Sequence, residues 1–159
     1  MKKIITIFLL LFLISCGSKD EKKKGFEYNR TQKIDKKSND KNGSKALVDL
    51  DNKGIGPIKK VDFATTVNTD LAEKGKATFN QKCTACHMAN RKLIGPAMKG
   101  IYERRSPEWV MNMLLNPAEM LKKDPIAIAL LKEYNNIMML NQNLTNDEAL
   151  SITEYFRTL

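Results

Sequence analysis

Apolar side chains recur at helical spacing at both ends of the C-terminal part of the chain. Near its start, Leu71, Gly75 and Phe79 lie four residues apart on one helical face, and Asp70 is suited to be the N-cap. We therefore expect a helix over residues 71–82. A glycine inside a helix costs about 1 kcal/mol relative to alanine, so Gly75 predicts a close crossing with a second helix.

The predicted partner in that crossing is the last helix, over residues 146–158. Thr145 and Glu148 have the spacing of a capping box just before it. An apolar stripe of helical period follows, made of Ala149, Ile152, Tyr155, Phe156 and Leu159. We expect Tyr155 or Phe156 to rest on Gly75.

Two more helices are predicted between these. Ser106 and Pro107 suit the N-cap and first turn of a helix that Asn116-Pro117 stops, and Asp124-Pro125 begins another. The first has an inward face made of Trp109, Val110, Met113 and Leu114. The second is apolar nearly all round, so we expect it to be largely buried. No strand pattern is found in this part of the sequence, so the predicted fold class is all-α.

The chain begins with the features of an export signal. Residues 1–15 have a basic start and then an apolar run too short for a permanent membrane helix, which is typical of a cleaved signal peptide. Leu13-Ile14-Ser15-Cys16 resembles the lipobox of bacterial lipoproteins. That resemblance implies cleavage before Cys16 and a lipid anchor on it. The alternative is an ordinary signal peptide with a chance cysteine.

Two segments of different composition separate the signal from the helices. Residues 16–45 are rich in charged side chains and poor in apolar ones, so we expect a disordered tether after the lipidated cysteine. Residues 46–69 regain apolar side chains, interrupted by glycine and proline. We expect them to form an extended arm packed on the domain surface.

The formal net charge of +9 is concentrated outside the predicted helical domain. Residues 70–159 hold 12 Lys and Arg against 10 Asp and Glu, whereas residues 16–69 hold 13 against 8. No basic helix with interleaved aromatic side chains is present. The sequence therefore argues against a nucleic-acid partner despite its basic balance.

Cys83-Thr84-Ala85-Cys86-His87 reads C-x-x-C-H, the spacing that attaches haem c. Two thiols add to the two vinyl groups of one porphyrin, and the imidazole that follows can ligate the iron. His87 is the only histidine in the chain. A structural zinc site would need two further Cys or His ligands, and a thioredoxin-like redox pair would need a βαβ context. The sequence offers neither, so it predicts covalent haem attachment.

The spacing Gly75-x3-Phe79-x3-Cys83-x2-Cys86-His87, followed much later by an aromatic terminal helix, resembles the class I c-type cytochromes. Leu93-Ile94-Gly95-Pro96 fits the same family. The resemblance implies a cytochrome c-like helical domain around one haem, over residues 70–159. It also implies that the Pro96 carbonyl accepts a hydrogen bond from the Nδ1–H of His87 and so orients the imidazole.

The methionines are the candidates for a second axial ligand to the haem iron. Five of those after the signal lie beside His87, soon after it, or in or near predicted helices: Met88, Met98, Met111, Met113 and Met120. Met138 and Met139 remain, in the loop before the last helix. In the resembled family the ligand precedes a proline a few residues before the final helix. Met139 occupies that place, but Leu140 stands where the proline would be, so Met138 stays an alternative.

The expected function is that of a one-electron carrier, a monohaem cytochrome acting between redox partners outside the cytoplasmic membrane. No histidine remains for acid–base catalysis, so we expect no enzyme activity of the protein itself. Trp109 is expected either to touch the haem or to be a core residue. The alternatives are a haem-based sensor or gas-binding module, and an electron-entry subunit of a respiratory or denitrification complex.

Overall fold

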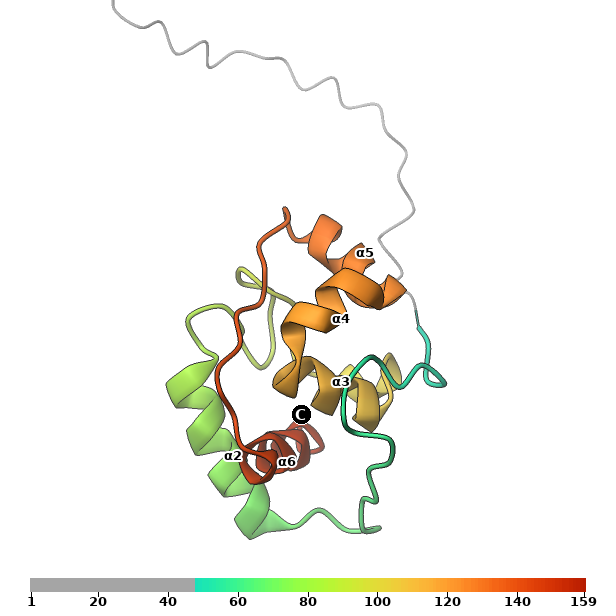
Figure 1. Cartoon of the computed structure of the whole chain (residues 1–159). Coiled ribbons are helices and arrows are strands. Elements are labelled where there is room, and N and C mark those ends of the chain that lie inside the picture. The colour runs from blue at the N-terminus through green and yellow to red at the C-terminus, as the bar shows by residue number, and fades with distance from the viewer. Residues whose placement is uncertain (1–47) are drawn as a thin grey trace, which may run out of the picture. The chain divides into compact units, whose positions relative to one another are not determined.

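The computed structural model describes residues 48–159, and Figure 1 shows how their helices are arranged. The predicted signal peptide, the lipidation of Cys16 and the tether over 16–45 lie outside the described residues. None of the helices in the described part of the chain is long and apolar enough to cross a membrane.

Five α-helices and one 3₁₀ helix make up the described structure. In chain order they are α2 (Thr69–Lys82), η1 (Ile101–Glu103), α3 (Pro107–Leu115), α4 (Pro117–Lys123), α5 (Pro125–Glu133) and α6 (Asn146–Phe156). Between residues 48 and 159 no strand forms, and the β-pairing there is one isolated bridge between Asp49 and Arg105. The predicted all-α fold class is therefore confirmed.

Side-chain caps begin the helices where the sequence places them. The hydroxyl of Ser106 accepts from the Trp109 N–H at the start of α3, and Asp124 caps α5 in the same way. At α6 both bonds of the capping box are present, between Thr145 and Glu148. Each cap satisfies backbone donors that lack partners inside the helix.

The start of α2 differs from the expectation. Its N-cap is Asn68, whose side chain accepts from the Leu71 N–H at 3.0 Å, and Asp70 lies in the first turn instead. Asparagine and aspartate are nearly equal as caps, so composition alone did not decide between them. The carboxylate of Asp70 still lies near the positive end of the helix dipole.

The middle of the domain holds one helix more than expected. Pro117 ends α3 as predicted but also occupies the first turn of α4, where its missing N–H needs no partner.

The expectation that the helix after Asp124 is largely buried was wrong. Only Ile126 and Ala127 of α5 are buried and Ala129 is exposed, because α5 packs mainly on α4 at one side.

Helices α2 and α6 cross at Gly75, as predicted. A Cβ atom on Gly75 would overlap the backbone of Ser151 and approach the nitrogen of Ile152 at 2.8 Å. The neighbours of Gly75 are therefore backbone atoms, not the rings of Tyr155 and Phe156. Those two rings pack one turn further along, where their centroids each lie 5.6 Å from the Phe79 ring. The close approach of the backbones leaves room for nothing larger than hydrogen.

The arm (residues 48–68) runs along α3 before it enters α2. Figure 1 shows it on the side of α3 opposite the long loop that joins α5 to α6. Its far end is fastened to α6, since Glu154 accepts from the Asn68 N–H at 2.6 Å and Arg157 donates to the Ala64 carbonyl at 2.8 Å. Phe63 packs edge-on against Tyr102. The arm thus connects the outer side of α3 with the crossing of α2 and α6.

Candidate functional site

The C-x-x-C-H motif forms a tight turn at the end of α2. Cys83 is the C-cap, with its N–H bonded to the Phe79 carbonyl at 2.9 Å. The N–H groups of Cys86 and His87 both donate back to the Cys83 carbonyl, at 3.1 and 2.9 Å. The turn carries two free thiols. That of Cys83 is half-buried, and that of Cys86 is exposed. Burial raises the pKa of the Cys83 thiol, and the nearby Lys82 charge opposes part of that rise.

His87 is held by a loop that folds back on the motif. Nδ1 of His87 lies 3.1 Å from the Pro96 carbonyl oxygen, which can only accept, so the proton is on Nδ1. This is the hydrogen bond that the family resemblance implied. In the neutral imidazole with this tautomer, Nε2 carries the lone pair that a metal can bind. Such a carbonyl contact fixes the plane of a ligating imidazole and increases its basicity.

Gly95 lies directly against the imidazole and was not singled out from the sequence. Its N–H donates to the Cys86 carbonyl at 2.8 Å, and a Cβ atom there would come within 3.0 Å of three ring atoms of His87. The glycine in the stretch Leu93-Ile94-Gly95-Pro96 was the available signal. The sequence did not show that the neighbour of this glycine is the His87 ring, because the contact forms only when the loop folds back.

The same loop is closed at its base by further bonds. Met98 N–H donates to the Met88 carbonyl and Lys99 N–H to the Ala89 carbonyl, at 3.2 and 2.8 Å. The guanidinium of Arg104 donates to three carbonyls of the loop, those of Ala97, Lys99 and Gly100. These contacts restrain the segment that carries the Pro96 carbonyl and so help to orient His87.

The two candidate methionines differ in their environment. Met139 is partly buried and packs against the hydrophobic core, whereas the Met138 side chain is 62% exposed. Met98, Met111 and Met120 are buried in the core. The thioether of Met139 is thus directed toward the core and that of Met138 toward solvent, and the assignment of Met139 as a ligand stays a prediction.

The loop that carries these methionines has an unusual backbone. Asn135, Asn136 and Asn143 have φ of 59°, 58° and 50°, in the left-handed region that asparagine tolerates better than most residues. The described hydrogen bonds of the backbone between these asparagines are local ones, such as that from the Ile137 N–H to the Tyr134 carbonyl. In the middle of the loop, Met139 is the side chain that packs against the core.

Trp109 is buried at 4% exposure, and its indole N–H donates to Asp124 at 3.0 Å. The guanidinium of Arg105 lies over its ring, 5.3 Å from the centroid. The single polar atom of the side chain therefore already has a protein partner. This is the environment of a core tryptophan, and contact with a haem stays a prediction.

The donor set fits a covalently attached haem. Two thiols without a disulfide partner, an imidazole with a free Nε2 and an inward thioether are the groups that haem c takes. They come from three separate segments: the end of α2, the loop after it and the loop before α6. Carboxylates, which hard metal ions prefer, contribute nothing to this set.

Comparison with known proteins agrees with this geometry. A family model described as Cytochrome c matches residues 72–159, more than half of the chain. The chain belongs to the cytochrome c family. Haem c is therefore its covalently bound cofactor, at the motif that contains Cys83 and Cys86, and haem-based electron transfer is its general function. No curated protein gives a significant match.

Solved class I cytochromes c share the fold. A cytochrome c from Rhodothermus marinus is 38% identical with a TM-score of 0.63, over 65% of this chain and 88% of its own. An engineered form of the Rhodothermus marinus cytochrome has a TM-score of 0.62 at 37% identity, over 65% of this chain and 89% of its own. The same engineered protein, bound to a carbene intermediate, has a TM-score of 0.60 at 37% identity, over 65% of this chain and 88% of its own.

Proposed function

We propose that this cytochrome carries single electrons between redox proteins and has no catalytic activity of its own. When bound, haem c supplies an iron that alternates between the ferrous and ferric states. The observation that carries the proposal is the imidazole of His87, oriented by the Pro96 carbonyl. With Met139, which packs against the core, as the second ligand, His87 would form a strong-field ligand pair that suits electron transfer.

The protein's contribution is to hold both ligands still. Electron transfer needs little rearrangement of the ligands between the two oxidation states, which rigid packing favours. His87 is restrained by the loop up to Gly100, and Phe79, Tyr155 and Phe156 form an aromatic cluster behind the motif. A thioether ligand is soft and favours the ferrous state, so Met139 is expected to raise the reduction potential.

We propose that redox partners dock on the two loops that carry the ligands. Both expose large apolar side chains, namely Leu93, Ile94, Ile137, Met138 and Leu140. The ammonium of Lys92 lies 4.3 Å from the centroid of the Tyr134 ring, which joins one loop to the other. Grouped exposed apolar side chains are characteristic of interaction sites.

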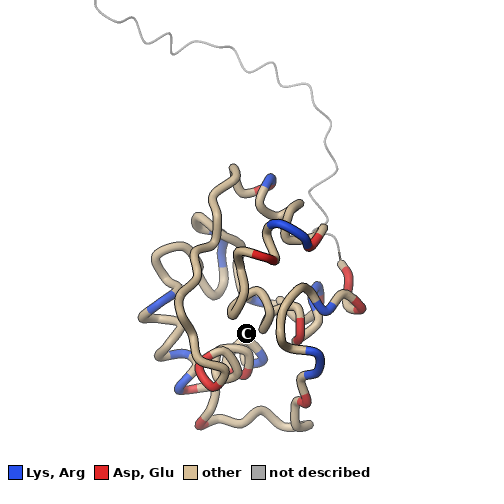
Figure 2. The backbone as a smooth tube through the Cα atoms, in the orientation of Figure 1, with Lys and Arg blue, Asp and Glu red and all other residues tan. Residues whose placement is uncertain are grey.

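The charges of these loops favour an acidic partner. Residues 88–100 hold Arg91, Lys92 and Lys99 and no acidic residue. Residues 134–144 hold no charged residue, and Figure 2 shows this loop in tan along its length. Basic side chains beside an apolar centre would steer an acidic redox protein by long-range attraction.

The proposed location is the cell envelope, with a lipid on Cys16 as the membrane anchor. Support comes from the export signal and from the lipobox-like stretch, both in the sequence before the described residues. Two acyl chains give durable anchoring where one gives only marginal binding. A nucleic-acid partner is not proposed, since the domain itself is nearly balanced in charge.

An optical spectrum of the mature haem protein tests the carrier proposal. The oxidised form should show the far-red charge-transfer band of methionine–iron ligation, and the reduced form should bind carbon monoxide slowly or not at all. A spectrum without that band, together with rapid binding of carbon monoxide, would instead support the gas-binding or sensor alternative.

A further inference from the structure

The arm meets the domain in an unusual way. Among the described residues, one hydrogen bond between main-chain atoms joins residues 48–67 to the rest of the domain, from the Asp49 N–H to the Arg104 carbonyl. Most of the other hydrogen bonds run between side chains of the helical part and the main chain of the arm. The outer face of α3 and α4 therefore recognises a segment of backbone.

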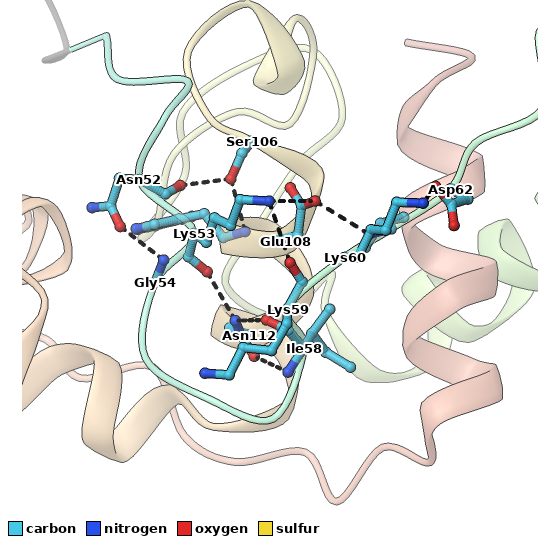
Figure 3. A network of polar contacts seen from close by, with 12 residues as sticks. Asn52, Lys53, Gly54, Ile58, Lys59, Lys60, Asp62, Ser106, Glu108 and Asn112 are labelled. Carbon is cyan, nitrogen blue, oxygen red and sulfur yellow. Dashed lines mark hydrogen bonds and ion pairs between the residues drawn. The ribbon is translucent and has the colours of Figure 1, made fainter.

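Asn112 is the centre of this recognition. Its side chain is completely buried, and all of its polar directions are used (Figure 3). Nδ2 donates to the carbonyls of Lys53 and Ile58, both at 2.8 Å, and Oδ1 accepts from the Ile58 N–H at 3.0 Å. One carboxamide thus binds three main-chain groups, which come from both ends of the bend between Lys53 and Ile58.

Neighbouring side chains extend the pattern along the arm. Ser106 donates to the Asn52 carbonyl at 2.6 Å, and the Met120 sulfur accepts from the Ile55 N–H at 2.9 Å. The Glu108 carboxylate accepts from the Val61 N–H at 3.2 Å. Both carbonyls and N–H groups of the arm are bound here, and the bends at residues 55–57 bring the Lys53 and Ile58 carbonyls to the same nitrogen of Asn112.

Two glycines fit places where the site has no room for a side chain. Gly54 has φ of +73°, and a Cβ atom on it would lie 2.8 Å from the sulfur and terminal carbon of Met120. A Cβ atom on Gly56 would overlap the carboxamide of Asn112. The site therefore selects for glycine at two positions separated by one residue.

The side chain of Asn52 in the arm is recognised as well. Asn52 donates to Asp124 at 2.7 Å, and its own oxygen accepts from the Gly54 N–H at 2.7 Å. Asp124 is 1% exposed and is held in place by the Trp109 indole and the Ala127 N–H. Asn52 thus binds the Asp124 carboxylate, whose position is also fixed by its hydrogen bonds with Trp109 and Ala127.

We propose that the surface formed by α3, α4 and Asp124 is a peptide-binding site, and that residues 52–58 are the ligand that the chain supplies to itself. The site takes a bent segment of the form Asn-x-Gly-x-Gly and binds it mainly through main-chain atoms. The same sequence on a separate molecule is expected to occupy the site when the arm is released. This site is distinct from the ligand loops, and it extends the cytochrome unit to residue 48, beyond the family match.

The first test is hydrogen exchange of the haem-loaded protein, read residue by residue by NMR. Gly56→Val should release the arm, so protection of the Ile58 and Val61 amides should fall at least tenfold while α2 and α6 keep theirs. Lys60→Val adds the same side chain at an exposed position of the arm and should change nothing. Unchanged protection in Gly56→Val, or equal loss in α2 and α6, would overturn the proposal.

The second test supplies the ligand from outside. A synthetic peptide with the sequence of residues 50–62, added at millimolar concentration to Gly56→Val, should shift the Asn112 carboxamide resonances. A peptide with alanine in place of Gly54 and Gly56 should not. If the native peptide produces no shift, or if both peptides produce the same one, the surface is not a peptide-binding site.

Discussion

The Pro96 carbonyl oxygen lies 3.1 Å from Nδ1 of His87, nine residues earlier in the chain. This one contact fixes both the tautomer and the plane of the imidazole, because a carbonyl accepts and never donates. Gly95 lies directly against the imidazole ring, so any side chain at this position would push the ring away. The orientation of His87 therefore depends on a backbone segment more than on any neighbouring side chain.

Gly95→Ala is expected to displace the imidazole while leaving the haem attached, since both cysteines are untouched. Overpacking of this kind typically destabilises by about 1–3 kcal/mol. The reduction potential and the electron paramagnetic resonance of the ferric form should both change. Ala97→Gly, two residues on, is the control and should leave the spectrum as it is. An unaltered ferric spectrum in Gly95→Ala would show that the loop yields instead of the ring.

Met139→Ala is expected to abolish the far-red band of the oxidised protein and to open the iron to carbon monoxide. Met138→Ala should keep the band, because its side chain is 62% exposed and points away from the core. Optical spectra of the two variants decide the matter. The reverse pattern would assign the ligand to Met138, and a band retained in both variants would exclude this loop as its source.

Gly75→Leu is expected to separate α2 from α6, because a side chain at this position meets the backbone of Ser151. The loss should be about 1–3 kcal/mol or more, since backbone atoms cannot move aside as a side chain can. For a domain of this size that corresponds to a fall of roughly 4–8 °C in Tm per kcal/mol. Ala77→Leu on the exposed side of α2 is the matched control, and an equal fall in both would contradict the prediction.

Acid is expected to weaken the hold of α3 on the arm. Burial alone would raise the pKa of Glu108, but hydrogen bonds from its own N–H, the Val61 N–H and the Lys53 ammonium outweigh that effect and lower it. A lowered pKa means that the stabilisation is complete above the unfolded-state pKa and is lost as pH falls through the folded-state value. The variant Glu108→Gln has no titratable group at this position, so it is the reference for the effect of the carboxylate charge.

Urea unfolding of both proteins from neutral pH to about pH 3 measures this linkage. The stability advantage of the unaltered chain over Glu108→Gln should shrink steadily toward the acid end. Asp62→Asn, at an exposed carboxylate of the same arm, should show a smaller change. A constant difference between the unaltered chain and Glu108→Gln at all pH values would mean that the carboxylate charge contributes nothing.

Cys16→Ala is expected to move the protein from the membrane to the soluble fraction, because the lipid would have no attachment point. Fractionation of cells that mature c-type cytochromes measures this directly, with haem staining to follow the protein. Ser15→Ala, which leaves the cysteine in place, should stay with the membrane. Membrane retention of Cys16→Ala would contradict the lipoprotein proposal.

Local patterns in the sequence predicted local structure well. The caps at Ser106, Asp124 and Thr145 were found because a cap depends on residues three positions apart. The crossing at Gly75 was also predicted, since a glycine inside a helix needs a packing reason. The residues that contact Gly75 were not predicted correctly. Their identity depends on the rotation of each helix about its own axis at the crossing.

Two features had no adequate signal in the sequence. Pro117 was interpreted as a stop, although proline equally begins a helix, so α4 was missed. The arm's docking depends on Asn112, which is separated from Lys53 and Ile58 by more than fifty residues. A lone asparagine in an apolar helix face gives no indication of which distant backbone it binds.

The joints between the middle helices have a consequence for how this sequence can change in length. Asn116 is both the C-cap of α3 and the N-cap of α4, and Asp124 has the same double place between α4 and α5. A residue inserted at either joint would leave one of the two adjoining helices without its capping residue, because one residue now serves both. Insertions and deletions are therefore expected to collect in the loop over 135–144, between α5 and α6, and to be absent from residues 106–133.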